Sequence, residues 1–468
     1  MHTPNLDGLA GRGLTFRQAY AQIALCGPSR TSFLTGRRPE TLKTFSNREP
    51  YWRKRAGNFT TFPQYFKENG YHTVSVGKIF HPGKLSGRSD DWPYSWSVKP
   101  FHPKTEKFKN AKVCGNSKKK HADLVCPVSV QDQPGKTLPD LETTEYSVNF
   151  IRNWKNRSKP FFLAVGFHKP HIPLKYPQDY LNYYPKANIS VASNWRIPQK
   201  LPDVAWNPFQ DLRKRRDISD LNVSFPYGPI PFDYQKLIRQ SYFASVSYID
   251  SLVGKIMEAL NSSGLAENTI VVFTSDHGWS LGEHGEWSKY SNFGVALQVP
   301  LIISLPSLRN RQVSNSFVEL LDLFPSLVQL SKLPLPPKCP KSNPSSLLTC
   351  VEGQSFAPIF VSPKNVTKSA VFGQYPRPDL LPQLNSDQPR HREIEVMGYT
   401  VRTVDYQYTE WIGYDPEKNE GNWSQVDARE LYDLATDSQE NDNVASDPKY
   451  ANIVKRMAVL LRSQNLSY

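Results

Sequence analysis

The segment from Cys26 to Gly36 combines residue types that can hold and attack an anion. Pro28 is typical of the first turn of a helix and Gly36 of its end, so we expect a short helix with Cys26 at its N-terminus. The N–H groups and the dipole at that end attract negative charge, and Arg30 can aim a guanidinium at the same place. The spacing therefore predicts an anion site around one cysteine. The alternative is a buried structural thiol on a capped helix.

Charged and histidine side chains follow three predicted strands, each at the point where the strand ends. The runs at 72–76, 161–165 and 269–274, like a fourth run at 300–305, are apolar on both faces, which is typical of buried strands in a largely parallel sheet. Ligand-binding groups of open α/β sheets lie at the carboxyl ends of the strands, so we expect these side chains to converge on one crevice. They are Lys78 and His81, then His168 and His171, then Asp276, His277 and, further on, Lys289. A charged surface rim is the alternative interpretation.

The cysteine segment also carries a family resemblance. Cys26-Gly27-Pro28-Ser29-Arg30, followed by Thr35-Gly36-Arg37, resembles the signature of the type I sulfatases. In that family the cysteine is oxidised after synthesis to formylglycine, whose hydrated aldehyde is the nucleophile. The resemblance thus implies a formylglycine-generating enzyme as a partner during biosynthesis.

Carried over residue by residue, the resemblance implies roles for the residues named above. It makes Cys26 the formylglycine precursor and, with Asp276 and His277, a ligand of one calcium ion. It makes Arg30 and Lys78 the residues that steady the nucleophile. The residues that it implies hold the sulfate or donate a proton are His81, His168 and Lys289. Many sulfatases have Asp-Asn where this chain has Asp276-His277, and histidine is a softer ligand for calcium.

The chemistry of sulfate-ester hydrolysis accounts for these residue types. A sulfate monoester is already an anion, so cations such as Arg30, Lys78 and Lys289 are needed to screen repulsion and hold the spreading charge. A hard divalent cation would lower the pKa of the nucleophile and polarise an S–O bond. The leaving sugar oxygen needs a proton, which a histidine can supply at mildly acidic pH.

The substrate class is indicated by charge and by further segments. With 57 Lys and Arg against 43 Asp and Glu, the chain has a formal charge of +14, which suits a sulfated polysaccharide or a nucleic acid. No nucleic-acid-binding module is recognisable. The stretches 168–173 and 374–378 are most similar to sulfatases that act on 2-sulfated iduronate. That resemblance implies a lysosomal enzyme for the non-reducing end of heparan sulfate and dermatan sulfate. The basic clusters at 118–120 and 213–216 fit polyanion binding or, alternatively, solvated loop charge.

Cysteine spacing and glycosylation sequons indicate the secretory pathway. Cys114 with Cys126 and Cys339 with Cys350 form local pairs that leave Cys26 alone, so we expect two short-loop disulfides and one special thiol. Five reduced cysteines are the alternative. Asn-x-Ser/Thr sequons occur at Asn58, Asn156, Asn188, Asn222, Asn261, Asn365, Asn422 and Asn465. No apolar run approaches the length of a membrane span.

Strands that alternate with helices predict an α/β fold. The clearest helical repeat runs from about residue 233 to 263, and an alternating pattern at 398–411 predicts an antiparallel hairpin before a helix near 450–462. The resemblance implies an alkaline-phosphatase-like fold. We therefore expect a large mixed, mostly parallel sheet with helices on both faces over residues 1–361, and a smaller C-terminal α+β subdomain with antiparallel strands over 362–468.

The first residues raise a separate expectation. They show no signal peptide, and Thr3-Pro4 is typical of a helix start. Sulfatases open with a strand ending in an Asp-Asp pair that binds the metal, and we expect this strand and pair to be missing here. The 468-residue chain should then bind calcium weakly and show little sulfatase activity, while a chain extended upstream is active.

Two other function classes fit parts of the pattern. One is a phosphoryl-transfer relative on the same fold, which would use Ser or Thr as nucleophile and more metal ligands. The other is an inactive, N-terminally incomplete sulfatase-like protein that binds glycosaminoglycan. Cys26 in its Pro-Ser-Arg context favours the sulfatase.

Overall fold

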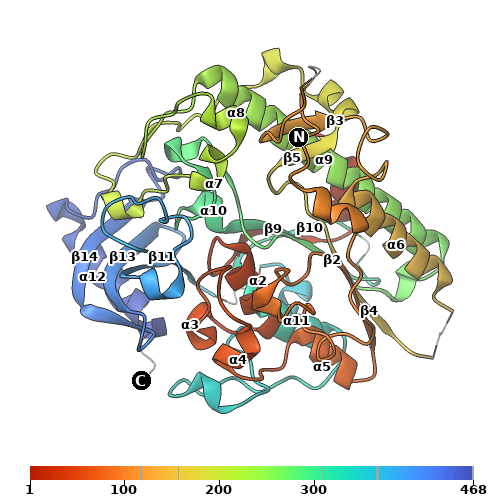
Figure 1. Ribbon diagram of the computed structural model, residues 1–468. Helices are drawn as coiled ribbons and strands as arrows, with labels where there is room; N and C mark the ends of the chain where they lie inside the picture. The colour runs from red at the N-terminus through yellow and green to blue at the C-terminus, as the bar shows by residue number, and fades with distance from the viewer. Residues whose placement is uncertain (116–118, 156–157, 309, 365–367, 466–468) are drawn as a thin grey trace.

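The computed structural model describes residues 1–115, 119–155, 158–308, 310–364 and 368–465. Lys118, Asn156 and Asn365, which the sequence analysis singled out, lie outside these ranges. A larger unit of helices around central strands lies beside a C-terminal sheet (Figure 1). The chain enters this structure through α1 (Pro4–Gly11), the helix expected after Thr3.

The central strands form a mixed sheet and a separate parallel pair. Their order is β10 (Gln312–Glu319), β1 (Leu14–Tyr20), β9 (Gln298–Ser304) and β6 (Val271–Thr274) in the first, and β2 (His72–Gly77) beside β4 (Phe161–Gly166) in the second. β1 is parallel to β10, whereas β9 runs antiparallel to both β1 and β6. The α/β class and the mixed sheet are confirmed. The run at 300–305, expected among largely parallel strands, is antiparallel to both neighbours.

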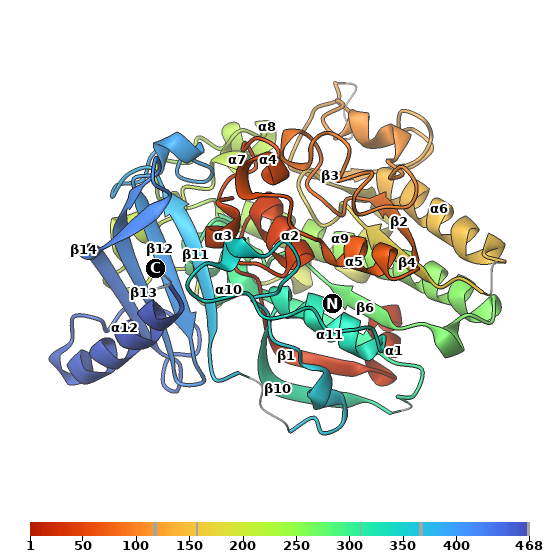
Figure 2. The same ribbon diagram turned by 90° about the horizontal axis from the view of Figure 1, so that it is seen from below.

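Helices cover both faces of β4 and β6, as Figure 2 shows from below. Phe162 and Val272 pack in one core with α2 (Cys26–Thr35), α5 (Phe62–Glu68) and α11 (Leu323–Leu330). Phe161 and Val271 point the other way, into a core with α6 (Pro139–Asn153) and α9 (Phe232–Ser262). Side chains alternate along a strand, so one apolar run serves both layers. This is why the runs show no polar face in the sequence.

β4 and β6 share these two helix layers but are not hydrogen-bonded to each other. Each is the last strand of its sheet among the described residues. Both are only half-buried along almost their whole length, whereas β2 is buried at every position but its first. Each strand therefore has one open backbone edge within the part of the chain that the structure describes.

The C-terminal unit is an antiparallel sheet with one helix on it. Its order is β11 (Val371–Arg377), β12 (Val396–Arg402), β13 (Tyr406–Asp415) and β14 (Glu420–Asp433). Met457 and Leu461 of α12 (Ala451–Asn465) pack on the sheet. The predicted hairpin and final helix are thus confirmed, and the boundary at residue 361 stays a prediction.

Short elements complete the chain. Among them are α3 (Pro39–Leu42), α4 (Trp52–Ala56), the 3-10 helix η2 (Lys104–Phe108), β3 (Val125–Val128), β5 (Leu174–Pro177), α7 (Gln210–Arg213), α8 (Arg216–Ser219), β7 (Ser280–Leu281), β8 (Trp287–Ser288) and α10 (Gly294–Leu297). Both predicted disulfides are present, Cys114–Cys126 with S–S 2.06 Å and Cys339–Cys350 with S–S 2.11 Å. None of the helices in the described ranges combines the length and the apolar composition needed to cross a bilayer.

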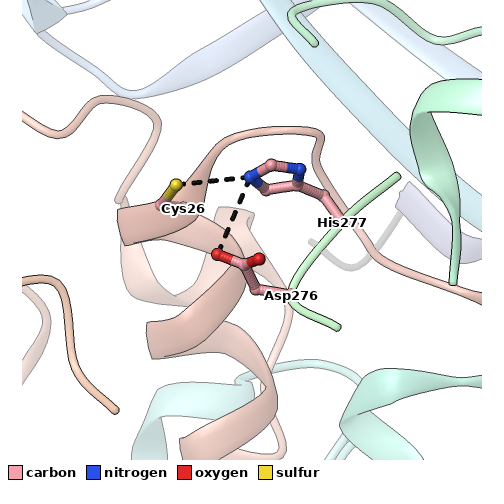
Figure 3. Close-up of side chains that lie close together, drawn as sticks. All are labelled: Cys26, Asp276 and His277. Carbon is pink, nitrogen blue, oxygen red and sulfur yellow. Dashed lines mark hydrogen bonds and ion pairs between the residues drawn. The ribbon is translucent and has the colours of Figure 1, made fainter. Parts of the chain in front are cut away.

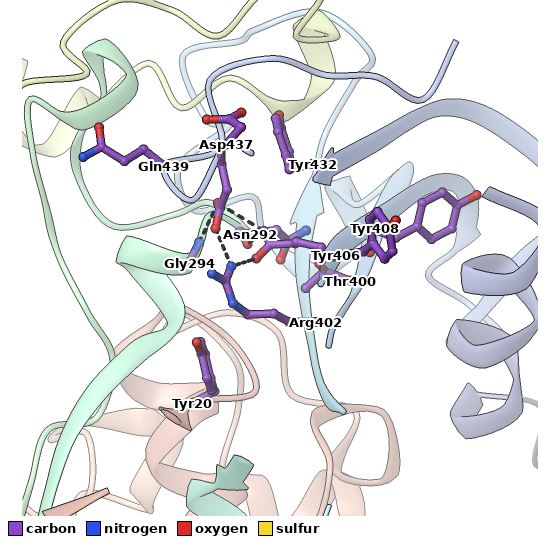
Figure 4. A network of polar contacts seen from close by, with 12 residues as sticks. Tyr20, Asn292, Gly294, Thr400, Arg402, Tyr406, Tyr408, Tyr432, Asp437 and Gln439 are labelled. Carbon is purple, nitrogen blue, oxygen red and sulfur yellow. Dashed lines mark hydrogen bonds and ion pairs between the residues drawn. The ribbon is translucent and has the colours of Figure 1, made fainter. Parts of the chain in front are cut away.

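Polar networks join the C-terminal sheet to the larger unit. In one, the Glu440 carboxylate accepts a hydrogen bond from the backbone N–H of Gly294 at 2.9 Å and pairs with Arg402 of β12. Figure 4 labels Gly294 and Arg402. The Gln407 amide of β13 donates to the Asn292 carbonyl oxygen at 2.9 Å. These bonds fix the segment just after Lys289 against the C-terminal sheet.

A second network is centred on Glu319, the last residue of β10. Its carboxylate accepts two bonds from the Arg38 guanidinium, at 3.0 and 3.1 Å, and pairs with Lys368. Lys368 also pairs with Asp322 at 2.7 Å, and the Phe372 N–H donates to Glu319 at 3.2 Å. Burial opposes ionisation of Glu319, but Arg38 and Lys368 outweigh it and lower the pKa of this carboxyl. One buried acid thus connects the start of α3, the central sheet and β11.

We expect Glu319→Gln to lower the free energy of unfolding by about 3 kcal/mol, because Arg38 would remain buried without its carboxylate. The folded-state pKa of Glu319 is depressed. Its contribution is therefore present above the unfolded-state pKa and lost as pH falls through the folded-state pKa. Urea unfolding across the acidic range measures both effects, with the exposed Glu267→Gln as the matched control. Equal midpoints for the two variants would contradict the assignment.

Candidate active site

Cys26 occupies the first position of α2, where the sequence predicted it. The preceding Leu25 is extended, and the helix ends at Gly36, whose φ of 65° is in the left-handed region that favours glycine. The Cys26 side chain is 1% exposed. The helix thus places a single buried sulfur at a terminus that favours negative charge.

Two lysines and a histidine surround this sulfur. The distances from Cys26 Sγ are 3.1 Å to Lys289 Nζ, 3.3 Å to His277 Nε2 and 3.5 Å to Lys78 Nζ (Figure 3 shows Cys26 and His277). They come from three separate segments: the one after β8, the one after β6 and the one after β2. The predicted convergence at strand ends is therefore observed for these side chains.

The surroundings favour an anion at the position of the sulfur. Burial alone would raise the pKa of the Cys26 thiol, but the charges of Lys289, Lys78 and His277 outweigh it. A hydrogen bond from His171 acts in the same direction, and the pKa of the thiol falls well below its ordinary value. An ester oxygen or a nucleophilic oxygen at this place would meet the same field.

Arg30 is directed at Asp276 rather than at the sulfur. Its Nε donates to the Asp276 carboxylate at 2.8 Å, and its Nη1 donates to the carbonyl oxygens of Lys78 at 2.5 Å and Ile79 at 2.9 Å. Burial opposes ionisation of Asp276, and Arg30 and His277 lower the pKa of this carboxyl. Arg30 therefore ties the cysteine helix to the ends of β2 and β6.

His81 and His171 are two half-buried histidines whose pKa values respond to the charges at this centre. Burial and the lysines, Lys78 first, lower the pKa of His81 to about 4 and hold that of His171 well below its usual range. His171 Nδ1 lies 2.7 Å from the Ile172 carbonyl oxygen, which leaves Nε2 for the Cys26 side. His81 Nδ1 is buried with no hydrogen-bond partner in the described ranges. The surroundings therefore disfavour the protonated form of both rings.

The structure brings His171 to Cys26 and places His168 in another cluster. His168 Nε2 is 3.2 Å from Glu106 and Nδ1 is 3.5 Å from Asp140. Burial opposes its charge, but these carboxylates raise the pKa of His168. Asp140 also accepts the backbone N–H groups of His168 at 2.6 Å and Lys169 at 3.2 Å. His168 and Asp140 thus hold the turn that presents His171.

Sequence reasoning named His171 in its segment but gave it no role. Both histidines lie in one four-residue stretch after β4, so spacing alone did not separate them. The turn is closed by the His171 N–H, which donates to the His168 carbonyl oxygen at 2.9 Å. Two further residues were missed. Asn47 Oδ1 accepts the Gly27 N–H at 2.7 Å, and Asn47 Nδ2 donates to Gln388 of the C-terminal unit at 3.3 Å. A lone Asn or Gln in a loop gives no sequence signal for this role.

Cys26, Asp276 and His277 form the one group of potential metal ligands found among the described residues, with ligand atoms within 4.8 Å of one another (Figure 3). Together they offer a sulfur, a carboxylate oxygen and an imidazole nitrogen. Calcium takes six to eight oxygen ligands, and the Asp276 oxygen nearest His277, at 3.7 Å, already accepts Arg30. These three residues alone do not make a calcium site.

The comparisons with known proteins agree with this geometry. The chain is 47% identical to human iduronate 2-sulfatase, over 96% of this chain and 87% of the relative. It is 46% identical to the mouse iduronate 2-sulfatase, over 97% of this chain and 88% of the relative.

Solved structures at lower identity share the fold. BT1596, described as a 2-O GAG sulfatase, superposes with a TM-score of 0.67 at 21% identity, over 98% of this chain and 86% of that one. The phosphonate monoester hydrolase of Silicibacter pomeroyi gives 0.71 at 18% identity, over 100% and 91%. The family model described as Sulfatase matches residues 1–333. With the family model over most of its length and its signature cysteine at the centre of the site, the chain belongs to the sulfatase family.

Proposed function

We propose that this chain is a sulfuric ester hydrolase that removes the 2-sulfate of L-iduronate at the non-reducing end of heparan sulfate and dermatan sulfate. The observation that carries the proposal is the identity of 46 and 47% to two iduronate 2-sulfatases over nearly the whole chain. The cationic setting of Cys26, with Lys289 at 3.1 Å and Lys78 at 3.5 Å, supports it. We place the enzyme in the lysosome, reached through the secretory pathway, which the two disulfides support.

Cys26 enters this proposal as the precursor of formylglycine, made by a formylglycine-generating enzyme. A thiolate that attacked sulfur would leave an adduct with no easy route of release. The aldehyde hydrate supplies a nucleophilic oxygen and a second hydroxyl through which sulfate can leave by elimination. The charges that lower the pKa of the Cys26 thiol would also favour an anionic oxygen at the same place.

The surrounding residues stabilise the sulfate charge, transfer a proton and position the reacting groups. Lys289 and Lys78 are 2% and 8% exposed, so their charges act on the sulfate oxygens with little screening by water. An entering sulfate offsets the lysine charges that depress the pKa of His81 and His171, so substrate binding raises both pKa values. One imidazole can then carry a proton to the sugar oxygen. Arg30 positions Asp276 and the β2 end, and His168 holds the turn that carries His171.

The competing functions become outcomes of the assays. The phosphonate monoester hydrolase shares the fold at 18% identity, and a shared fold at that level does not identify the substrate. The Pro-Ser-Arg context of Cys26 favours sulfate esters. Hydrolysis of a phosphonate monoester in preference to iduronate 2-sulfate would support the phosphoryl-transfer alternative. Binding of sulfated glycan without hydrolysis would support a glycosaminoglycan-binding protein.

The first prediction from this proposed function concerns the nucleophile. In protein from a eukaryotic secretory host, the peptide containing Cys26 should show sulfur replaced by oxygen in its mass spectrum. Cys26→Ser cannot follow this route, and we expect it to lower kcat on a 2-sulfated iduronate substrate by about 10³-fold or more. Its melting temperature should stay close to that of the parent. Fully active protein with an intact, alkylatable thiol at this position would refute the proposal.

The second prediction separates the two histidines. We expect His171→Asn to lower kcat by about 10²-fold, as for loss of a proton-transfer group. We expect His168→Asn to act mainly on stability, lowering the free energy of unfolding by about 3 kcal/mol because Asp140 loses its partner. Urea unfolding and steady-state kinetics on both variants measure the difference. A stable His168→Asn protein with the larger loss of kcat would reverse the assignment.

The third prediction concerns calcium, which the family implies, with Asp276 and His277 as two proposed protein ligands. Because the described donors supply one carboxylate, we expect the 468-residue chain to bind calcium with a Kd of about 10⁻⁴ M or weaker. Asp276→Asn should abolish that binding in isothermal titration calorimetry, and the exposed Asp427→Asn should leave it unchanged. Tight binding that survives Asp276→Asn would show that other residues hold the ion.

A further inference from the structure

A short helix is fixed directly beside Lys289. Asp211 of α7 accepts the Ser288 hydroxyl at 3.1 Å and the Tyr290 hydroxyl at 2.7 Å. These two donors are the residues on either side of Lys289 in the sequence. The segment that continues from α7 toward α8 is therefore held at the edge of the active site.

Arg215, at the end of this segment, reaches across to a second loop. Its Nη1 donates to Asn110 Oδ1 at 3.0 Å. That loop is held on its other side by Lys175, whose Nζ donates to the Phe108 carbonyl oxygen at 2.9 Å. It is also tied to the His171 turn, because Glu106 of η2 is 3.2 Å from His168 Nε2. Asn110 and its neighbour Lys109 are thus placed between two segments that border the site.

Lys109 and Arg215 are cations at this contact, and the charges of Asp211 and Asp217 act on Arg215 from beyond ion-pairing distance. Neither side chain has a carboxylate within ion-pairing distance in the part of the chain described. Lys109 is exposed and Arg215 is half-buried. Partial desolvation, then the charges of Lys78, Arg215 and Lys289, lower the pKa of Lys109 to about 8. Repulsion of this kind is relieved when an anion binds between the charges.

Lys78 and Lys289 already suffice for one sulfate ester at the Cys26 position. We propose, on the basis of the function proposed above, that Lys109 and Arg215 form a second anion-binding subsite, which holds an anionic group of the glycan other than the ester being cleaved. A carboxylate and a sulfate both suit it, because the planar guanidinium of Arg215 can donate two parallel bonds to either group. The carboxylate belongs to the uronate itself, and the sulfate to the neighbouring sugar.

Three substrates distinguish these sources. They are iduronate 2-sulfate on a neutral aglycone, its methyl ester, which lacks the carboxylate charge, and a disaccharide whose second sugar carries a sulfate. We expect Lys109→Gln to raise KM about three- to tenfold for the substrate whose anion occupies the subsite, with kcat little changed. The KM of the methyl ester should change least. Lys449→Gln, which removes one exposed lysine of the C-terminal unit, should leave all three KM values unchanged.

A binding measurement separates this proposal from the proposed activity. Isothermal titration calorimetry with the desulfated product disaccharide, still carrying the sulfate of its second sugar, reports the subsite without catalysis. Arg215→Gln should weaken this binding three- to tenfold and reduce its dependence on salt, and Arg215→Lys should recover part of it. An unchanged Kd in both variants, or equal KM shifts on all three substrates, would overturn the subsite. An inactive parent enzyme that still shows the shifts in Kd would overturn only the iduronate 2-sulfatase activity.

Discussion

The repulsion among buried cations around Cys26 is the constraint on which the rest of the site depends. Lys289 and Lys78 approach one sulfur at 3.1 and 3.5 Å while almost excluded from water. Such an arrangement is unfavourable unless negative charge lies close by. The protein supplies an ionisable group at the centre and fixed carboxylates one layer out. A bound substrate sulfate reduces the repulsion between the same lysines. The repulsion therefore both destabilises the site without an anion and favours anion binding.

The outer carboxylates also hold the segments of the site in position. Asp276 receives Arg30, Asp211 receives the two hydroxyls flanking Lys289, and Asp140 receives the N–H groups of the turn before His171. Each of these acids connects one site segment to a different element of the fold. The same three carboxylates therefore both set the charge around the site and hold its segments in place. A substitution at any of them would change the electrostatics and the structure of the site together.

The sequence predicted the elements that local pattern determines and missed those that depend on loops. Strand ends are readable because apolar runs are followed by polar residues, and Lys78, Asp276 and His277 were placed correctly near Cys26 in this way. The direction of β9 was not readable, because a doubly covered strand looks alike in either orientation. His171 and Asn47 were missed for another reason: their positions follow from turns and from a contact with Gln388, far along the chain, for which no local periodicity exists.

The open edges of β4 and β6 have a consequence for how copies of this chain meet. An unpaired edge presents a row of N–H and C=O groups that can accept any extended segment, including one from another molecule. Within the described ranges, two such edges belong to strands packed between the same helix layers, with half-buried apolar side chains along both. Intermolecular strand addition at this place would satisfy backbone and apolar surface together. Concentrated solutions of the chain would then lose material to β-rich aggregates that start from folded protein, without prior unfolding.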